Sequence, residues 1–262
     1  GYGFELLGSI QGVSIEDYVE SLRELHGYGF RSFAVGGLAK RDTEFLKRLI
    51  EVFIAEVRSL GDIKKVHFLG VTRLGILPLL NRLSDYVAEV SFDSSSVLRL
   101  AWTREHGNYL TADGKAYTAI RVVDNGTEIE EAARLLLKKL REYDRGVVSF
   151  DEVLEAVREY VKLVGHERYL PYYVATLRDM PWKRCDCAVC KSAGVDVVIF
   201  RGNNRNRRRG FHNVYVFSKL LRSGNFEVRF TVPKDGDVKI DETLGDEKLE
   251  FLLKNARTEL IV

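Results

Sequence analysis

The chain has 262 residues, of which 45% are hydrophobic and 30% are charged, so it is long enough to bury a sizeable core beneath a densely charged surface. The formal net charge of +2 excludes a protein coated with positive charge, and any contact with a polyanion must therefore be local. No apolar run approaches the roughly 18 residues of a membrane-spanning helix and no stretch resembles a signal peptide, so we expect a soluble, cytoplasmic protein without a membrane partner.

The first part of the chain alternates between short apolar segments and amphipathic segments. The apolar segments predict strands at 4–10, 31–35, 65–70 and 87–92, and the segments between them predict helices from Ser14, from Thr43 and over 74–84. Ser14 and Asp17 have the spacing of a capping box at the start of the first helix. Four β-α units at intervals of about 25–35 residues predict a parallel sheet or part of a (β/α)8 TIM barrel.

Small or polar residues follow each predicted strand. They are Gln11-Gly12, Gly36-Gly37, Gly70-Val71-Thr72 and Asp93-Ser94. In a barrel these strand ends meet on one face, where the loops build the active site, so Asp93 is a candidate catalytic carboxylate. The alternatives are a tight turn for Gly36-Gly37, a helix cap for Asp93-Ser94 and a surface amide for Gln11. His67, inside the third apolar segment, is more typical of a core histidine.

Residues 103–180 break the alternation. Asn108 to Lys115 predict a hairpin with an Asp-Gly turn. Amphipathic segments predict helices at 127–143 and 150–164 and a third helical piece from Pro171, a β-branched run predicts a strand at 195–200, and helices are expected at 211–222 and 244–257. We therefore divide the chain into half of a TIM-like barrel (1–102), a hairpin and helical insertion (103–180), and a cysteine-containing, C-terminal helical region (181–262).

All three cysteines lie close together, at Cys185, Cys187 and Cys190, and His212 follows them. Three thiolates and an imidazole make a closed tetrahedral site that leaves no position for water or substrate, so we predict a structural Zn²⁺. Ordinary thiols, or a disulfide between two of them, are the alternatives. An odd number of cysteines with a downstream histidine fits a metal better.

Five arginines lie between the last cysteine and the end of this motif: Arg201, Arg205, Arg207, Arg208 and Arg209. Guanidinium groups match phosphate oxygens bidentately, and the Gly and Asn residues among the arginines suit a tight anion-binding turn. We therefore predict that this run contacts a nucleic-acid backbone. A solvated loop is the alternative.

Six segments form an ordered set: GSIQG (8–12), FAVGGLA (33–39), HFLGV (67–71), SFDSSS (91–96), CxCxxC (185–190) and His212-Asn213. The set resembles the tRNA-guanine transglycosylase superfamily, zinc-containing TIM-barrel enzymes that exchange guanine for a 7-deazaguanine base. The resemblance implies that Asp93 is the nucleophile that attacks the ribosyl C1′. It also implies that Gln11, with Gly12, reads the base edge, and that the backbone of Gly36, Gly37, Leu38 and Ala39 lines the base pocket. Cys185, Cys187, Cys190 and His212 match the family's zinc ligands.

The matched strands resemble the family's fifth to eighth, which implies a C-terminal half-barrel. The strands that carry a second catalytic aspartate and another base-reading aspartate would then lie elsewhere in a longer chain or in a complementing chain. The family also implies a homodimer. Three features resemble the branch that inserts 7-deazaguanine derivatives into DNA (the DpdA type): the insertion at 127–180, PWKRCDCAVC and FRGNNRNRRRGFHN. The segment FDSSS also resembles the archaeosine-type tRNA enzymes.

The resemblance therefore implies a pentosyltransferase, provided that the other half-barrel is supplied. It would exchange guanine in DNA for a 7-cyano-7-deazaguanine-like base through a covalent glycosyl intermediate on Asp93. The target nucleotide would have to leave its stack to reach the pocket. The alternatives are the same exchange on tRNA and a non-catalytic, zinc-stapled subunit that binds nucleic acid.

Overall fold

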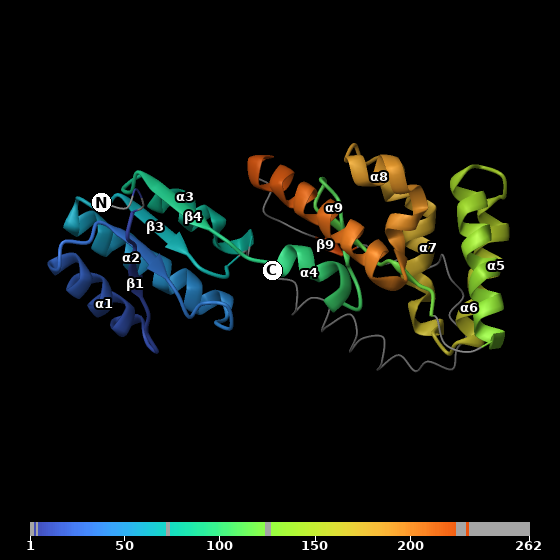
Figure 1. The fold of residues 1–262 in the computed structure, drawn as a ribbon, viewed down its shortest axis with the longest axis horizontal. Helices are drawn as coiled ribbons and strands as arrows, with labels where there is room; N and C mark the ends of the chain where they lie inside the picture. Colours follow the sequence, from blue (N-terminus) through green and yellow to red (C-terminus); the bar gives the residue numbers. More distant parts are fainter. Residues whose placement is uncertain (1–2, 4, 72–73, 124–126, 224–228, 231–262) are drawn as a thin grey trace. The chain divides into compact units, whose positions relative to one another are not determined.

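The computed structural model describes residues 3, 5–71, 74–123, 127–223 and 229–230 (Figure 1). The chain divides into two compact units, with the boundary in the sequence between Ser96 and Val97. Within the described residues, no helix combines the length and the apolar character needed to cross a bilayer.

The first unit is a parallel sheet with a helix between each pair of successive strands. Its strands are β1 (Gly8–Ile10), β2 (Ser32–Val35), β3 (Lys65–Phe68) and β4 (Glu89–Phe92), in the order β1-β2-β3-β4 with every neighbouring pair parallel. The connecting helices are α1 (Ile15–Gly27), α2 (Thr43–Leu60) and α3 (Leu77–Leu83), the last preceded by a 3₁₀ turn at Leu74–Ile76. The predicted alternation is confirmed.

Local chemistry explains where these helices begin. The side chains of Ser14 and Asp17 each accept a hydrogen bond from the other's backbone amide, so the predicted capping box is present at α1. At α2 the side chain of Asp42 accepts a 2.7 Å hydrogen bond from the amide of Phe45. Both caps satisfy amides that the first turn of a helix leaves without a partner.

The strand order determines the layering of this unit. Right-handed crossovers between strands in an unreversed order place successive helices on one face of the sheet, and α1 packs on α2 and α2 on α3. One set of alternate strand residues is buried, including Phe33, Val35, Val66 and Phe68. The opposite face carries an in-register row that is not fully buried: Ser9, Ala34, His67 and Ser91. The four described strands form an open parallel sheet with α1, α2 and α3 packed as one layer, and the (β/α)8 barrel stays a prediction.

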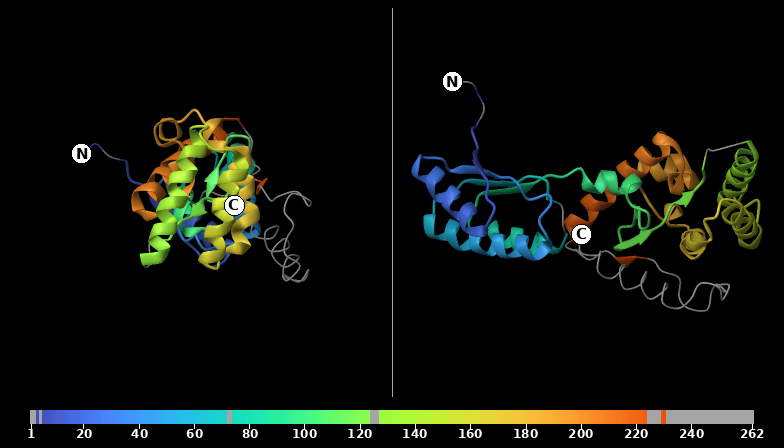
Figure 2. Two further views of the ribbon diagram at one scale, coloured as in Figure 1. Left: turned by 90° about the vertical axis from the view of Figure 1, so that its right-hand side faces the viewer. Right: turned by 90° about the horizontal axis from the view of Figure 1, so that it is seen from below.

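The second unit combines short strands with most of the helices. The strand β6 (Lys115–Tyr117) pairs with β5 (Tyr109–Leu110) in antiparallel and with β9 (Arg229–Phe230) in parallel orientation. The strands β7 (Ile120–Arg121) and β8 (Ile199–Phe200) form a separate parallel pair. The helices are α4 (Ser96–Thr103), α5 (Thr127–Asp144), α6 (Phe150–Leu163), α7 (Leu170–Asp179), α8 (Ala188–Ala193) and α9 (Gly202–Ser223), with 3₁₀ turns at Glu167–Tyr169, Pro181–Lys183 and Gly194–Val198. The predicted hairpin and the helices of the insertion are confirmed, and α5 and α6 lie side by side (Figure 2).

Two predictions in this unit are wrong. Residues 195–200 do not form one strand, because Gly194–Val198 is a 3₁₀ turn and only Ile199–Phe200 is extended. The turn buries Val195, Val197 and Val198, so tertiary packing overrides the β propensity of these residues. The arginine run is not an anion-binding turn either, since Arg205 to Arg209 lie within α9, which begins at Gly202 instead of at residue 211. The helix expected at 244–257 lies outside the described residues.

The predicted insertion and the cysteine-containing region share one hydrophobic core. Tyr109, Leu140, Tyr173 and Val197 are fully buried members of it. The observed unit begins at Val97, whereas the predicted boundary follows residue 102. The observed boundary lies earlier because α4 packs on α9 and so belongs to the second unit. The contact is close: a Cβ added to Gly210 of α9 would lie 2.9 Å from the carbonyl oxygen of Leu98 in α4.

Candidate active site and metal centre

The loops that follow the four parallel strands contact one another at the carboxyl edge of the sheet. The side chain of Gln11 packs over Gly36. A Cβ added to Gly36 would lie 3.5 Å from Cγ of Gln11. A Cβ at Gly70 would lie 3.3 Å from that of Ala39, and the amide of Gly70 donates a 2.8 Å hydrogen bond to Oδ1 of Asp93. The strand ends therefore converge as expected.

The glycines of this edge are explained by Tyr18, which the sequence did not single out. Tyr18 is fully buried, and its hydroxyl donates a 3.0 Å hydrogen bond to the carbonyl oxygen of Gly36. A Cβ at Gly12 would lie 2.8 Å from the Tyr18 amide nitrogen, and Gly37 has a φ of +72° and would place a Cβ 3.0 Å from the Tyr18 hydroxyl. The glycines thus allow the two loops to approach a common tyrosine.

Arg41 is a second residue that the sequence did not reveal. Its Nη2 donates hydrogen bonds to the carbonyl oxygens of Gly12 and Val13, at 3.2 and 2.8 Å, and its guanidinium lies over the ring of Phe45. Arg41 therefore ties the loop after β2 to the loop after β1. Leu38, in the same loop, is buried.

Asp93 lies just beyond β4 with its side chain 62% exposed. Its amide donates a 3.3 Å hydrogen bond to the carbonyl oxygen of Phe68, and its Oδ1 accepts the hydrogen bond from Gly70. The side chain of Ser94 accepts a 3.0 Å hydrogen bond from the amide of Ser96 at the start of α4. The exposed carboxylate of Asp93 is held at the edge of the sheet by Gly70.

His67 is not a core histidine, contrary to the interpretation from its apolar surroundings in the sequence. It lies on the face of the sheet opposite to the helices, and its side chain is 23% exposed. Its Nδ1 lies 2.9 Å from Oγ of Ser91, and its Nε2 lies 3.8 Å from Oδ1 of Asp93. The imidazole is therefore part of the surroundings of Asp93.

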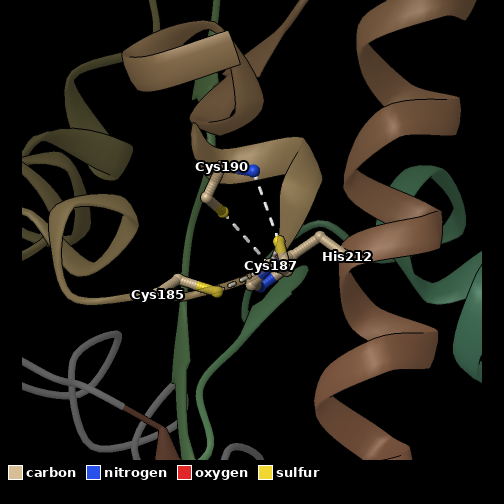
Figure 3. Close-up of side chains that lie close together, drawn as sticks. All are labelled: Cys185, Cys187, Cys190 and His212. Carbon is tan, nitrogen blue, oxygen red and sulfur yellow. Dashed lines mark hydrogen bonds between the residues drawn. The ribbon is translucent and has the colours of Figure 1, made fainter. Parts of the chain in front are cut away.

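In the second unit the three cysteines and His212 converge on one point (Figure 3). The sulfur atoms of Cys185, Cys187 and Cys190 lie 3.5, 3.4 and 3.3 Å from Nδ1 of His212, and the four ligand atoms all lie within 4.8 Å of one another. Bond lengths of about 2.3 Å to sulfur and 2.0 Å to nitrogen place tetrahedral zinc ligands roughly 3.5–3.8 Å apart. None of the cysteines forms a disulfide, so the cluster can hold a metal such as zinc.

The surrounding residues orient the ligands. Nε2 of His212 lies 2.8 Å from the carbonyl oxygen of Leu110. An N–H at Nε2 therefore donates to this oxygen and leaves Nδ1, the atom beside the sulfurs, free to bind a metal. The ring of Tyr109 stacks on His212 at 4.0 Å, and its hydroxyl lies 3.2 Å from the Cys190 sulfur. Cys187 accepts a 3.3 Å hydrogen bond from the Cys190 amide.

Asn213 extends this support to the hairpin. Its Oδ1 accepts a 3.0 Å hydrogen bond from the amide of Leu110, and its Nδ2 donates to the carbonyl oxygen of Asn108 at 3.1 Å. His212 and Asn213 therefore both fasten α9 to β5 and to the residue before it.

The pKa values of Cys185, Cys190 and His212 are shifted in different directions. Hydrogen bonds with Cys190 and His212 hold the pKa of Cys185 at about 3, whereas the hydrogen bond with Cys185 and burial raise the pKa of Cys190. Burial disfavours the imidazolium of His212, but hydrogen bonds with Cys185 and Cys187 raise its pKa to about 9. A divalent cation can replace the protons of these groups and satisfy all four ligands at once.

The five arginines occupy different environments. Arg207 and Arg208 are exposed on α9, and Arg201 and Arg205 are half-buried. Nε of Arg205 donates a 2.9 Å hydrogen bond to Asp196, so its charge already has a partner.

Arg209 is a structural residue, and its prediction as a nucleic-acid ligand is wrong. It is fully buried, and its guanidinium donates to the carbonyl oxygens of Ala101, Val197 and Ile199 and to Oδ1 of Asn206. Burial lowers the pKa of Arg209 to about 9, above neutrality. The buried cation fastens α9 to α4 and to the chain before β8, and it cannot reach a phosphate.

No protein-family model matches the chain. A curated relative, the DNA-guanine transglycosylase of Salmonella montevideo, is 33% identical to it over 242 residues. The similarity covers 84% of this chain and 56% of the relative, so the chain spans about half the length of the protein that it matches. The predicted resemblance is confirmed: the chain belongs to the guanine transglycosylase superfamily, and the relative that it matches is a DNA-type member.

Proposed function

We propose that this chain is the nucleophile-bearing part of a transglycosylase that exchanges guanine in DNA for a 7-deazaguanine base, such as 7-cyano-7-deazaguanine. The observation that carries the proposal is the setting of Asp93. One oxygen of this exposed carboxylate is held by the Gly70 amide, and the Gly36–Ala39 loop, which would line the base pocket, touches Gly70. The name of the matched relative favours DNA over tRNA.

In the proposed reaction Asp93 attacks C1′ of the target nucleotide and forms an ester as guanine departs with the electron pair of the glycosidic bond. The departing guanine takes up a proton at N9, and the incoming base loses its N9 proton as it attacks C1′, so that the C1′–Asp93 bond breaks and the carboxylate is released. Two successive displacements retain the configuration at C1′. Gln11, packed over Gly36, would read the edge of the base, and Arg41 and Tyr18 would hold the two loops that form the pocket.

We also propose that the sheet is half of a TIM barrel. The unreversed strand order and the packing of α1, α2 and α3 on one another support this arrangement. Further strands, from the rest of the full-length protein or from another chain, would complete the barrel and bring the remaining catalytic carboxylates. A homodimer stays a prediction of the resemblance.

The second unit would hold a structural Zn²⁺. Cys185, Cys187, Cys190 and His212 fill all four tetrahedral positions, so the metal would stabilise the packing of this unit and would not activate water or substrate. Arg207 and Arg208 remain exposed and are the arginines best placed to contact DNA phosphates. Arg201 is a further candidate for such a contact.

The test is a base-exchange assay with the full-length protein that contains this chain. The protein is incubated with labelled guanine or labelled 7-cyano-7-deazaguanine and with either duplex DNA or tRNA. We expect the label in DNA. Label in tRNA alone would overturn the DNA assignment, and binding of DNA without any exchange would favour a non-catalytic partner subunit.

A further inference from the structure

Three side chains share the face of the sheet opposite to α1, α2 and α3. His67 on β3 is in register with Ser91 on β4, and Asp93 follows two positions later. Because side chains two residues apart along an extended chain project to the same face, Ser91 and Asp93 flank the imidazole. The distances are 2.9 Å from Nδ1 of His67 to Oγ of Ser91 and 3.8 Å from Nε2 to Oδ1 of Asp93.

The chemistry of the three groups selects one arrangement of protons. A neutral imidazole has one N–H and one acceptor nitrogen, a hydroxyl can donate or accept, and an ionised carboxylate can only accept. If the Ser91 hydroxyl donates to Nδ1, the N–H lies on Nε2 and points to Asp93. The opposite tautomer would place the lone pair of Nε2 against a carboxylate oxygen. The carboxylate of Asp93 therefore favours the tautomer of His67 with the proton on Nε2, and the Ser91 hydroxyl supports this tautomer by donating to Nδ1.

The same oxygen of Asp93 has a second donor. Oδ1 accepts the 2.8 Å hydrogen bond from the amide of Gly70, whereas the approach of His67 at 3.8 Å is longer than a hydrogen bond. Such contacts between catalytic groups are often long in a free enzyme and shorten in the reacting complex. Two donors on Oδ1 would leave Oδ2 as the oxygen with the free lone pair.

We propose that His67 is a positioning residue for Asp93, with a proton on Nε2 and with Ser91 supporting this tautomer through a hydrogen bond to Nδ1. The inference rests on the proposed base exchange and deepens it. Oδ2 of Asp93 forms the bond to C1′ while Oδ1 stays with the Gly70 and His67 N–H groups. In the second displacement the C1′–Oδ2 bond breaks, its electron pair returns to the carboxylate, and the two donors stabilise the charge that develops.

Two variants distinguish whether His67 acts as a hydrogen-bond donor to Asp93 or only fills space beside it. His67→Phe keeps a ring of similar size without an N–H, and His67→Gln keeps an amide N–H that can reach Asp93. We expect His67→Phe to lower kcat for base exchange about 10-fold with an unchanged KM for the base, because the donor acts on the transition state. His67→Gln should recover most of the rate, and Ser91→Ala should fall between the wild type and His67→Phe.

A second measurement does not depend on turnover. In full-length protein labelled with ¹⁵N-histidine, the nitrogen resonances of His67 report which nitrogen is protonated. We expect a proton on Nε2 in the wild type and a mixture of tautomers in Ser91→Ala. A proton on Nδ1 in the wild type, or equal kcat values for His67→Phe and His67→Gln, would overturn the proposal. If the wild-type protein exchanges no base while the Nε2 tautomer is present, the proposed function fails and the arrangement of His67 stands.

Discussion

The amide of Gly70 donates a 2.8 Å hydrogen bond to Oδ1 of Asp93, although the two residues follow different strands. Gly70 has a φ of +74°, a conformation that other residues adopt only with strain, and it lies against Ala39. One glycine therefore connects the loop of the candidate base pocket to the candidate nucleophile. The setting of Asp93 depends on the ends of three adjacent strands.

Replacement of Asp93 by Asn should remove the nucleophile and preserve the structure around it. The amide oxygen of Asn can still accept the hydrogen bond from Gly70, but an amide does not form the glycosyl ester. We expect base exchange by the full-length protein to fall by roughly 10³-fold or more, with no covalent DNA adduct in denaturing gels. The melting temperature and the zinc content should match the wild type, and undiminished exchange would show that Asp93 is not the nucleophile.

Replacement of Cys190 by Ser should release the metal and destabilise the second unit. Cys190 is buried, and its sulfur contacts both His212 and Tyr109, so the loss of this ligand disturbs the core as well as the site. We expect less than one zinc per chain by elemental analysis and a lower melting temperature. Ser192→Ala, an exposed change in the same helix, is the matched control and should keep both values. Full zinc content in Cys190→Ser would contradict the assigned ligand set.

Asp144 should stabilise the 3₁₀ turn that carries the chain towards β8, because it accepts hydrogen bonds from Nε1 of Trp182 at 2.7 Å and from the amide of Val195 at 3.0 Å. Asp144→Ala leaves both donors without this partner and should lower the free energy of unfolding by roughly 1–3 kcal/mol at pH 7. Urea denaturation of the two proteins measures this difference.

The contribution of Asp144 should depend on pH. Burial alone would raise the pKa of this carboxyl, but hydrogen bonds from Trp182, Lys183 and Val195 outweigh burial, and the pKa lies below its ordinary value of 3.8. A lowered pKa in the folded state means that the stabilisation is complete above the pKa of the unfolded chain and disappears as the pH falls through the folded value. The difference between wild type and Asp144→Ala should therefore be constant from pH 7 to about pH 5 and shrink below about pH 4. A difference that grows on acidification would contradict this assignment.

The arginines of α9 should separate into a stabilising residue and binding residues. Arg209→Met leaves the carbonyl oxygens of Ala101, Val197 and Ile199 without their donor, so it should lower the melting temperature. Arg207→Ala with Arg208→Ala removes two exposed charges and should leave the melting temperature unchanged. The double variant should bind DNA of every sequence more weakly and reduce the salt dependence of binding by about one to two units of slope. If the salt dependence of DNA binding is unchanged, Arg207 and Arg208 belong to a solvated helix face and do not contact phosphates.

The sequence by itself determined the parts of this protein that depend on local patterns. The alternation of apolar and amphipathic segments predicted β1 to β4 and α1 to α3, because a strand and a helix repeat with different periods. The cluster of Cys185, Cys187 and Cys190 with His212 predicted a group of side chains that can hold a metal, since the ligand chemistry of thiolates and imidazole is contained in the residue types.

Only the tertiary structure decided which residues of the same type are structural and which are exposed for binding. Arg208 and Arg209 are neighbours in the chain, yet one is exposed and the other is buried against backbone carbonyls of distant segments. Every residue has a backbone carbonyl, so the sequence around an arginine does not show whether folding will bring such acceptors to its side chain. The same reason hid Arg41, whose partners are the carbonyl oxygens of Gly12 and Val13. His67 acquired its neighbours from the register of β3 against β4, which is set by the packing of the whole sheet.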